Sequence, residues 1–287
     1  MVKKRILVTG AGGQLGSEIQ VLSKHYPQFE FVFVDKDEMP LDQPEKIRPV
    51  IEEVRPDWCI SCGAYTAVDK AETEKDLAFT INGDAAGAIS AACKTIGARL
   101  IHISTDYVFD GDSAIPLQED DPTGPINVYG ASKLKGEQLA LQNNPETAII
   151  RTAWVYSEFG HNFVKTMIRL MKEKPSLSVI DDQIGSPTYA ADLAGVILHI
   201  VTAPHWTPGV YHYSNEGRIS WYEFALAIKE IIGSPCVVNP IPTSQYPTPA
   251  KRPRYSLLDK SRIKNTYGVN VPDWHNSLAT CIARLSI

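Results

Sequence analysis

The 287-residue chain is 44% apolar and 21% charged, which is ordinary for a soluble globular protein. Its formal net charge is -5, and no basic cluster follows Lys3, Lys4 and Arg5, which excludes a concentrated surface for nucleic acid. The first apolar run, residues 6–8, is too short for a signal peptide or a membrane span, and the five cysteines are odd in number and scattered. We predict a cytoplasmic protein that binds neither nucleic acid nor membrane.

The chain opens with a strand, a turn and a helix. An apolar strand is predicted at 5–9, and a helical pattern continues through residue 22. The turn between them has glycines spaced G-x-x-G-x-x-G, which let a backbone approach a pyrophosphate at a helix N-terminus. We therefore predict a dinucleotide site formed by Gly10, Gly13, Gln14, Leu15 and Gly16.

The next strand, predicted at 31–34, ends in a charged turn. Asp35 lies at the distance from the glycines that is typical of a carboxylate binding the adenosine ribose diol. It would oppose a 2'-phosphate, which the neighbouring Lys36 would accept, so the choice between NADPH and NADH stays open. Asp35 also fits the simpler role of a turn residue at a strand end. Asp35, Lys36 and Asp42 are candidate cofactor residues.

Helices and strands then alternate. Helices are predicted at 44–54, 77–95 and 129–142, and strands at 58–61, 99–104 and 147–152. This order predicts a Rossmann-type α/β fold, a doubly wound parallel sheet whose ligands bind at the carboxyl ends of the strands. The segments that follow the strands are expected to line one crevice; they include Gly63, Ala64, Tyr65 and Thr66.

Tyr129 and Lys133 lie four residues apart on the helix predicted at 129–142, so they share one helix face. The ammonium group is expected to lower the pKa of the phenol, which would make Tyr129 a proton donor. The same spacing also occurs by chance on solvated helix faces. Thr105 ends the preceding strand, and the long polar loop at 106–127 between them is typical of a functional segment.

After residue 153 the elements are shorter and prolines are frequent. Helices are predicted at 163–172, 191–201, 221–232 and 274–285, a strand at 177–180, and an extended segment at 240–253. We interpret residues 1–152 as a dinucleotide-binding domain and 153–287 as mostly a smaller C-terminal substrate-binding lobe. Part of about 188–213 is expected to return to the first sheet.

Cys59 and Cys62 match C-x-x-C, a spacing that metal and redox sites use. No second pair follows at zinc spacing, and both cysteines lie in an apolar run typical of a buried strand. The seven histidines are not grouped at ligand spacing either. We interpret the cysteines as packing residues and predict no metal site.

Seven stretches along nearly the whole chain together resemble the extended short-chain dehydrogenase/reductase family. They are TAVDKAE at 66–72, STDYVF at 104–109, NVYG at 127–130, RTAWVY at 151–156, GSPT at 185–188, YPTPAKRP at 246–253 and PDW at 272–274. In that family a Rossmann domain is joined to a small lobe that binds a sugar nucleotide. The likeness is strongest to its reductases of dTDP-bound 4-keto-6-deoxy sugars, which serve cell-surface polysaccharide synthesis.

The resemblance implies that Thr105, Tyr129 and Lys133 are catalytic and that NADPH, or alternatively NADH, is the reductant. Hydride would reach the C4 carbonyl carbon, Tyr129 would protonate the oxygen, Thr105 would hydrogen-bond it, and Lys133 would hold the nicotinamide ribose. It further implies a dTDP-sugar substrate contacted by Thr66, Val68, Thr105, Tyr107, Tyr129, Trp154, Lys251 and Arg252.

Three of these substrate residues also have simpler interpretations. An indole face suits the apolar face of a deoxysugar, yet Trp154 taken alone also fits a protein core. Lys251 and Arg252 would meet the diphosphate, or they would be surface charges.

Some family members dimerise through a magnesium ion held by glutamates. Glu18 fits the first ligand position, but Ala191 stands where an acid is expected, and residues 284–287 carry no carboxylate side chain. We therefore predict no bridging metal and a monomer.

Other functions stay open at this stage. Another sugar-nucleotide reductase, or an epimerase or dehydratase of the same family, would share most of these residues. A non-catalytic regulatory subunit, resembling the partner of methionine adenosyltransferase, would keep the Rossmann domain without the reaction. The complete set of Thr105, Tyr129 and Lys133 argues against the subunit.

Overall fold

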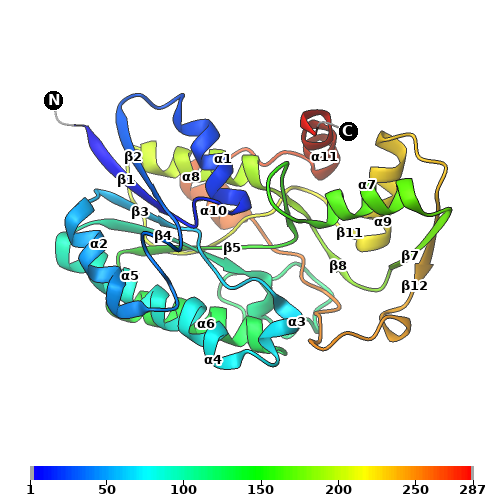
Figure 1. The fold of residues 1–287 in the computed structure, drawn as a ribbon, viewed down its shortest axis with the longest axis horizontal. Helices are drawn as coiled ribbons and strands as arrows, with labels where there is room; N and C mark the ends of the chain where they lie inside the picture. Colours follow the sequence, from blue (N-terminus) through cyan, green and yellow to red (C-terminus); the bar gives the residue numbers. More distant parts are fainter. Residues whose placement is uncertain (1–2, 286–287) are drawn as a thin grey trace.

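Six parallel strands form the central sheet of the computed structural model, which describes residues 3–285 (Figure 1). Their order across the sheet is β10-β5-β4-β3-β1-β2. They are β1 Lys4–Thr9, β2 Phe29–Val34, β3 Trp58–Ser61, β4 Arg99–Thr105, β5 Thr147–Thr152 and β10 Gly209–His212. The predicted Rossmann-type parallel sheet is confirmed.

Helices cover both faces of this sheet (Figure 1). One face packs against α1 Gln14–Ser23, α8 Ala190–Thr202 and α10 Ser261–Tyr267. The other face packs against α2 Ile47–Val54 and α5 Ala85–Ile96, with α6 Val128–Asn143 beside α5. The chain thus returns to the sheet after residue 189 through α8 and β10. The division of the chain near residue 152 stays a prediction.

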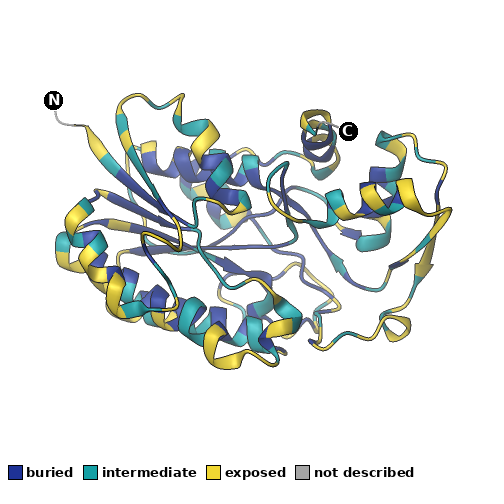
Figure 2. Cartoon of the chain, viewed as in Figure 1, coloured by how far each residue is buried: buried dark blue, intermediate teal, exposed yellow. Residues whose placement is uncertain are grey.

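The central strands are continuous apolar runs because both of their faces are covered. Ile60, Ile101 and Ile150 on three neighbouring strands are 0% exposed. Burying such a side chain contributes about 1.5–3 kcal/mol relative to leaving it in water. Figure 2 shows that the buried strands lie between helices whose outer faces are exposed.

The topological switch point of the sheet lies between β1 and β3, where β2 is reached in one direction and β3 in the other. Two loops meet there. Gly10 has φ +65°, and a Cβ at this position would lie 2.7 Å from the backbone of Gly63. The Gly63 N–H donates to Thr9 Oγ1 at 3.2 Å. This close approach brings the turn after β1 beside the segment after β3, as expected of a dinucleotide crevice.

The helix predicted at 77–95 is confirmed as an unbroken helical run, but its early part contains a π-helical turn that was not predicted. The structure has α4 Lys75–Phe79, a π-helical turn Thr80–Asp84, and then α5, with the short α3 Val68–Ala71 before them. The π turn places the buried Asn82 side chain inward, where it accepts from the Tyr65 N–H at 2.8 Å and donates to the Tyr65 carbonyl at 3.0 Å. Periodicity does not reveal such a turn, which inserts one residue per turn without an apolar signal.

A smaller lobe lies at one end of the sheet (Figure 1, right). Its helices are α7 Phe163–Glu173, α9 Trp221–Ile231 and α11 Trp274–Arg284. Its strands pair two by two and are β6 Val155–Tyr156 with β9 Thr188–Tyr189, β7 Ser176–Ile180 with β12 Val237–Ile241, and β8 Ile184–Gly185 with β11 Ile219–Ser220. A separate core that includes Tyr156, Phe224 and Leu278 holds them together. The sequence patterns did not predict β12 or α10.

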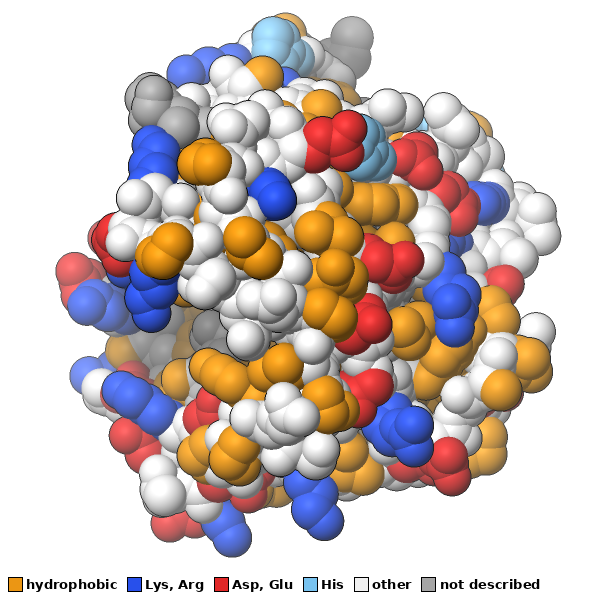
Figure 3. All heavy atoms as spheres, turned by 90° about the vertical axis from the view of Figure 1, so that its right-hand side faces the viewer, with side chains coloured by type: hydrophobic (Ala, Val, Ile, Leu, Met, Phe, Trp, Pro, Cys, Tyr) orange, Lys and Arg blue, Asp and Glu red, His pale blue; other side chains and the backbone are white. Residues whose placement is uncertain are grey.

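The surface of the small lobe mixes basic, acidic and apolar side chains (Figure 3). Within residues 3–285, no helix combines the length and the apolar character that crossing a membrane requires. All five cysteines are free, and Cys59 is buried.

Candidate active site

The first turn of α6 brings Tyr129 to the end of β4. The Asn127 side chain caps the helix by accepting from the Gly130 N–H at 2.7 Å. A Cβ at Gly130 would lie 2.1 Å from the Tyr107 carbonyl, so only glycine lets the helix start against the turn that follows Thr105. Asparagine before a helix is a recognisable capping signal. The close contact at Gly130 has no such signal in a single sequence.

Tyr129 is half-buried, and its ring meets the Tyr107 ring edge-on, with centroids 5.6 Å apart at 80°. Burial raises the pKa of Tyr129 to about 12. The negative charge of Asp106 also raises this pKa, whereas the hydrogen bond with the Thr105 hydroxyl lowers it. The phenol therefore keeps its proton at neutral pH.

Lys133 is 2% exposed, and its ammonium group donates to the Ile103 carbonyl of β4 at 2.7 Å. Burial lowers the pKa of Lys133 to about 8, although the charge of Glu137 acts in the opposite direction. Burial outweighs any effect of the Lys133 charge on the pKa of Tyr129. The predicted lowering of the Tyr129 pKa by Lys133 is therefore wrong for this structure, because the ammonium group points to the strand and burial dominates.

Thr105 is 6% exposed, and its hydroxyl donates to Asp106 Oδ1 at 3.0 Å while it accepts from the Tyr107 N–H at 3.2 Å. Asp106 is 2% exposed, and burial raises its pKa to about 6. Its Oδ2 has no hydrogen-bond partner within residues 3–285. The sequence patterns did not single out Asp106, although it lies inside the stretch at 104–109.

The turn after β1 fits an anionic cofactor. The N-terminus of α1 at Gly13 has no side-chain cap, which leaves the backbone N–H groups of Gln14, Leu15 and Gly16 for a pyrophosphate. Leu15 and Gly16 are buried, whereas Gln14 is half-buried and its Oε1 accepts from Asn162 of the small lobe at 2.9 Å. The predicted cofactor turn therefore also contacts the second lobe.

Asp35 lies against that turn. Its Oδ2 accepts from the Gly12 N–H at 2.7 Å and its Oδ1 from the Lys36 N–H at 2.9 Å. Asp35, Lys36 and Asp42 are all exposed, so each is accessible to a ligand. The Tyr65 hydroxyl donates to Glu74 at 2.6 Å, and Ala64 beside it is half-buried. Asp35 and Lys36, whose opposite charges were expected to compete for the adenosine ribose, therefore both lie beside this turn.

The segment after β3 meets the proline-rich segment of the second half. Thr66 is exposed and Val68 is half-buried there. Asp69 accepts a two-pronged hydrogen bond from Arg252, from Nη1 at 2.7 Å and from Nη2 at 2.8 Å. This guanidinium group holds the pKa of Asp69 below its ordinary range. The structure thus brings Arg252 to the segment after β3, but in an ion pair with Asp69.

Lys251 is exposed, and its carbonyl accepts from the Asn127 side chain at 2.8 Å. The residue is therefore beside the N-terminus of α6, close in the fold to Tyr129.

Trp154 has the left-handed backbone angle φ 49°, which is uncommon for a residue with a side chain. Its indole stacks on Trp221 with centroids 3.7 Å apart at 15°, and Gly185 packs against its edge. The side chain is half-buried. Strained backbone that the surroundings hold in place is a feature of binding sites.

A second polar cluster joins α1 to the small lobe. Glu18 is 1% exposed and accepts from the Ser157 hydroxyl at 2.7 Å. Burial raises the pKa of Glu18 to about 7, with Ser157 lowering it and Glu158 raising it. Arg284 lies 3.6 Å from Glu158.

No group of three histidine, cysteine or acidic side chains among residues 3–285 could hold a metal ion. Ser286 and Ile287, which belong to the C-terminal segment where a metal ligand was expected in relatives, lie outside the described residues.

Comparison with known proteins adds independent evidence. The model of the RmlD substrate binding domain family matches residues 4–287. A dTDP-4-dehydrorhamnose reductase of Burkholderia thailandensis is 40% identical over 300 residues, covering 98% of this chain and 99% of that protein.

Two solved structures agree with this match. A dTDP-4-dehydrorhamnose reductase of Clostridium acetobutylicum has a TM-score of 0.95 at 40% identity, covering 99% of this chain and 100% of that one. The enzyme of the same name from Bacillus anthracis, solved in complex with NADP, has a TM-score of 0.94 at 39% identity, covering 98% of this chain and 99% of that one. The resemblance found in the sequence is confirmed.

Proposed function

The chain belongs to the RmlD substrate binding domain family, and from that premise we propose that it is an oxidoreductase of dTDP-L-rhamnose synthesis. It reduces the C4 keto group of dTDP-4-dehydro-6-deoxy-L-mannose, that is dTDP-4-dehydrorhamnose, to give dTDP-L-rhamnose. NADPH is the reductant, with NADH as the alternative. The observation that carries the proposal is the convergence of Thr105, Tyr129 and Lys133 at the end of β4.

The arrangement suits protonation of a carbonyl oxygen that gains negative charge. When bound, the nicotinamide supplies the hydride that adds to C4. Tyr129 holds its proton at neutral pH, because its pKa is about 12, and releases it only to a stronger base such as the developing alkoxide. Thr105 donates to the same oxygen once its hydroxyl turns from Asp106. The added hydride and proton together account for the alcohol product.

The contacts to the substrate follow from the walls of the crevice. In this proposal Thr66, Val68, Tyr107 and Trp154 contact the sugar, and the indole of Trp154 covers the apolar face of the deoxysugar. Arg252 lies near enough to the segment after β3 to meet the diphosphate, although Asp69 holds it. Lys251 is exposed beside it. A monomeric state and a cytoplasmic location remain our expectations for the protein.

Consumption of the reduced nicotinamide tests the function. The purified protein, NADPH and a panel of nucleotide 4-keto sugars are mixed, and loss of nicotinamide absorbance is followed together with the sugar product. One NADPH is expected to disappear for each dTDP-L-rhamnose formed. An epimerase or dehydratase would convert the sugar without net consumption, and a regulatory subunit would do neither. Either result would overturn the reductase assignment.

A further inference from the structure

α6 carries a third buried polar residue on the face that holds Tyr129 and Lys133. Glu137 follows Lys133 by four residues, so the three side chains lie in one row along the helix. Lys133 is 2% exposed and Glu137 is 3% exposed. A carboxylate buried this deeply requires strong partners, because it has lost its hydration.

Two neighbouring strands supply those partners. Ser104 Oγ of β4 donates to Glu137 Oε1 at 2.5 Å. Arg151 of β5 donates from Nη2 to Oε2 at 2.7 Å and from Nε to Oε1 at 2.9 Å. Ser104 and Arg151 are register partners, and Thr105 and Thr152 form the next pair. Glu137 therefore fastens α6 to the sheet one residue before Thr105.

Glu137 is also one of the charged groups around Lys133. The ammonium group donates to the Ile103 carbonyl, and Glu137 from its own helix and Cys62 from beyond β3 both favour its charge. His102 of β4 is neutral, because burial and Lys133 lower its pKa. Arg151 on the third strand is paired with Glu137. Glu137 is thus the buried carboxylate that offsets the desolvation of Lys133.

We propose that Glu137 is a positioning residue for the reduction: clamped by Ser104 and Arg151, it holds the helix of Tyr129 to the strand of Thr105 and places a negative charge one helical turn from the buried Lys133. The inference rests on the proposed function, because it takes Tyr129 and Lys133 as the residues that meet substrate and cofactor. The Glu137–Arg151 ion pair would then contribute to the reaction as well as to folding.

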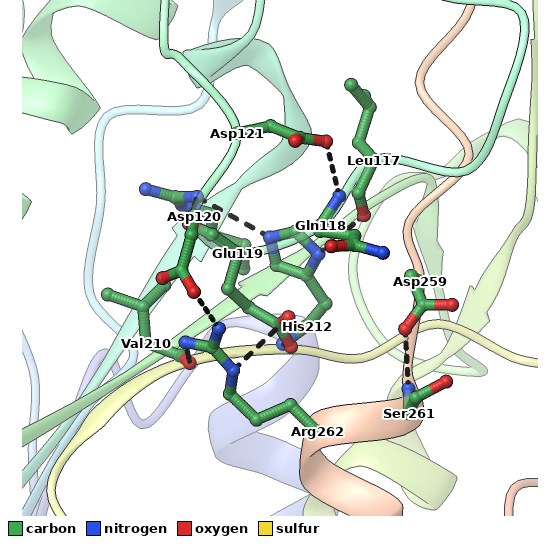
Figure 4. Close-up of polar contacts among 11 residues, drawn as sticks. Leu117, Gln118, Glu119, Asp120, Asp121, Val210, His212, Asp259, Ser261 and Arg262 are labelled. Carbon is green, nitrogen blue, oxygen red and sulfur yellow. Dashed lines mark hydrogen bonds and ion pairs between the residues drawn. The ribbon is translucent and has the colours of Figure 1, made fainter.

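Glu119 offers a matched control, and Figure 4 shows it beside His212 and Arg262. Its side chain is 3% exposed, it accepts from the His212 N–H at 3.1 Å, and it lies 3.5 Å from Arg262 Nε. Its carbonyl accepts from Arg151 Nη1 at 3.2 Å. Glu119 is therefore a buried carboxylate of the same network, but it is not among the groups that shift the pKa of Lys133.

The test compares profiles of kcat/KM between about pH 5.5 and 9.5 for the wild type, Glu137→Gln and Glu119→Gln. Loss of the Glu137 charge is expected to lower the Lys133 pKa, so the alkaline limb moves down by about one pH unit. The loss of activity is then about tenfold larger at the alkaline end than at the acid end. Glu119→Gln is expected to lower Tm and to leave the limb in place. A Glu137→Gln profile reduced by one constant factor, with an unmoved limb, would leave Glu137 as a structural ion pair and overturn the proposal.

Glu137→Gln leaves Arg151 unpaired and can prevent folding, so a second variant is included. Glu137→Asp keeps the charge but withdraws the carboxylate by one methylene, away from Ser104 and Arg151. We expect kcat to fall about tenfold or more with the alkaline limb nearly unmoved. Wild-type kcat in Glu137→Asp would contradict a positioning role. Failure of the proposed function shows differently, because the wild type itself would then consume no NADPH.

Discussion

The two walls of the crevice are built in different ways. On the sheet side, Thr105 ends the seven-residue strand β4, and Tyr129 and Lys133 lie on the sixteen-residue helix α6. On the lobe side, Trp154 lies between β5 and the two-residue strand β6, in a strained conformation held by Trp221 and Gly185. Regular elements fix the proposed reacting groups by repeating hydrogen bonds, whereas the lobe fixes Trp154 by side-chain packing.

This difference separates chemistry from recognition. The proposed proton donor and its neighbours are placed by backbone geometry, which the identity of the substrate does not alter. The lobe surface depends on individual side chains, so we expect single substitutions there to change which sugar fits. Four predictions test whether the two walls divide the work in this way, and they are given from the largest expected effect to the smallest.

Removal of the Tyr129 hydroxyl tests the sheet side. In Tyr129→Phe, kcat is expected to fall about 10²- to 10⁴-fold, because the developing alkoxide loses its proton donor. Binding of NADPH, measured by fluorescence titration, should stay within about threefold of wild type. Tyr107→Phe is the matched control, since it removes the neighbouring phenol and is expected to raise KM instead. A Tyr129→Phe enzyme with near-wild-type kcat would remove this residue from the mechanism.

The junction of the two walls is expected to respond to pH through Glu18. Its folded pKa of about 7 is raised above the ordinary 4.5, so the folded protein binds more protons than the unfolded chain between these values. The contribution of Glu18 to stability is therefore complete below about pH 4.5 and is lost as pH rises through 7, by at most about 3 kcal/mol.

Thermal unfolding checks this prediction. Between about pH 5 and 8, the Tm of Glu18→Gln should fall less than that of the wild type, because the amide does not ionise. Glu53→Gln, at an exposed position of α2, serves as control and should follow the wild type. Parallel curves for all three proteins would show that Glu18 does not titrate in this range.

Trp154 tests the lobe side. Trp154→Ala is expected to raise KM for the sugar nucleotide about 10- to 100-fold, the value of one buried apolar contact, with a smaller change in kcat. Trp221→Leu keeps Trp154 but removes the ring stacked behind it, and should raise KM less. If kcat fell more than KM rose in both variants, Trp154 would contribute to the chemical step. The proposed separation of catalysis on the sheet side from recognition on the lobe side would then be wrong.

The cofactor turn is expected to show the smallest effect. Asp35→Ala removes the carboxylate proposed to bind the ribose diol, and should shift the ratio of kcat/KM for NADPH over NADH upward by about three- to tenfold. Lys36→Ala should shift the ratio downward, because the 2'-phosphate loses a positive partner. Steady-state assays with both reductants measure the two ratios. Unchanged ratios in both variants would place the discrimination at another residue.

The sequence by itself determined the parts of this protein that follow from periodicity and local chemistry. Alternating apolar runs and helical patterns predicted the parallel sheet, since strands and helices repeat every two and 3.6 residues. The glycine turn, Thr105, and the spacing of Tyr129 and Lys133 predicted a ligand site at the strand ends, because each follows from local sequence alone.

Only the tertiary structure decided how the side chains in that crevice behave. The Lys133 ammonium group points to the Ile103 carbonyl and Tyr129 is desolvated, so the pKa of the phenol rises where spacing predicted a fall. Asp106, Asn82, Glu137 and the Asp69–Arg252 ion pair became visible only when distant segments came together. Burial and hydrogen bonding between remote residues have no local signature, because the same side chain is solvated in one fold and charged, paired or neutral in another.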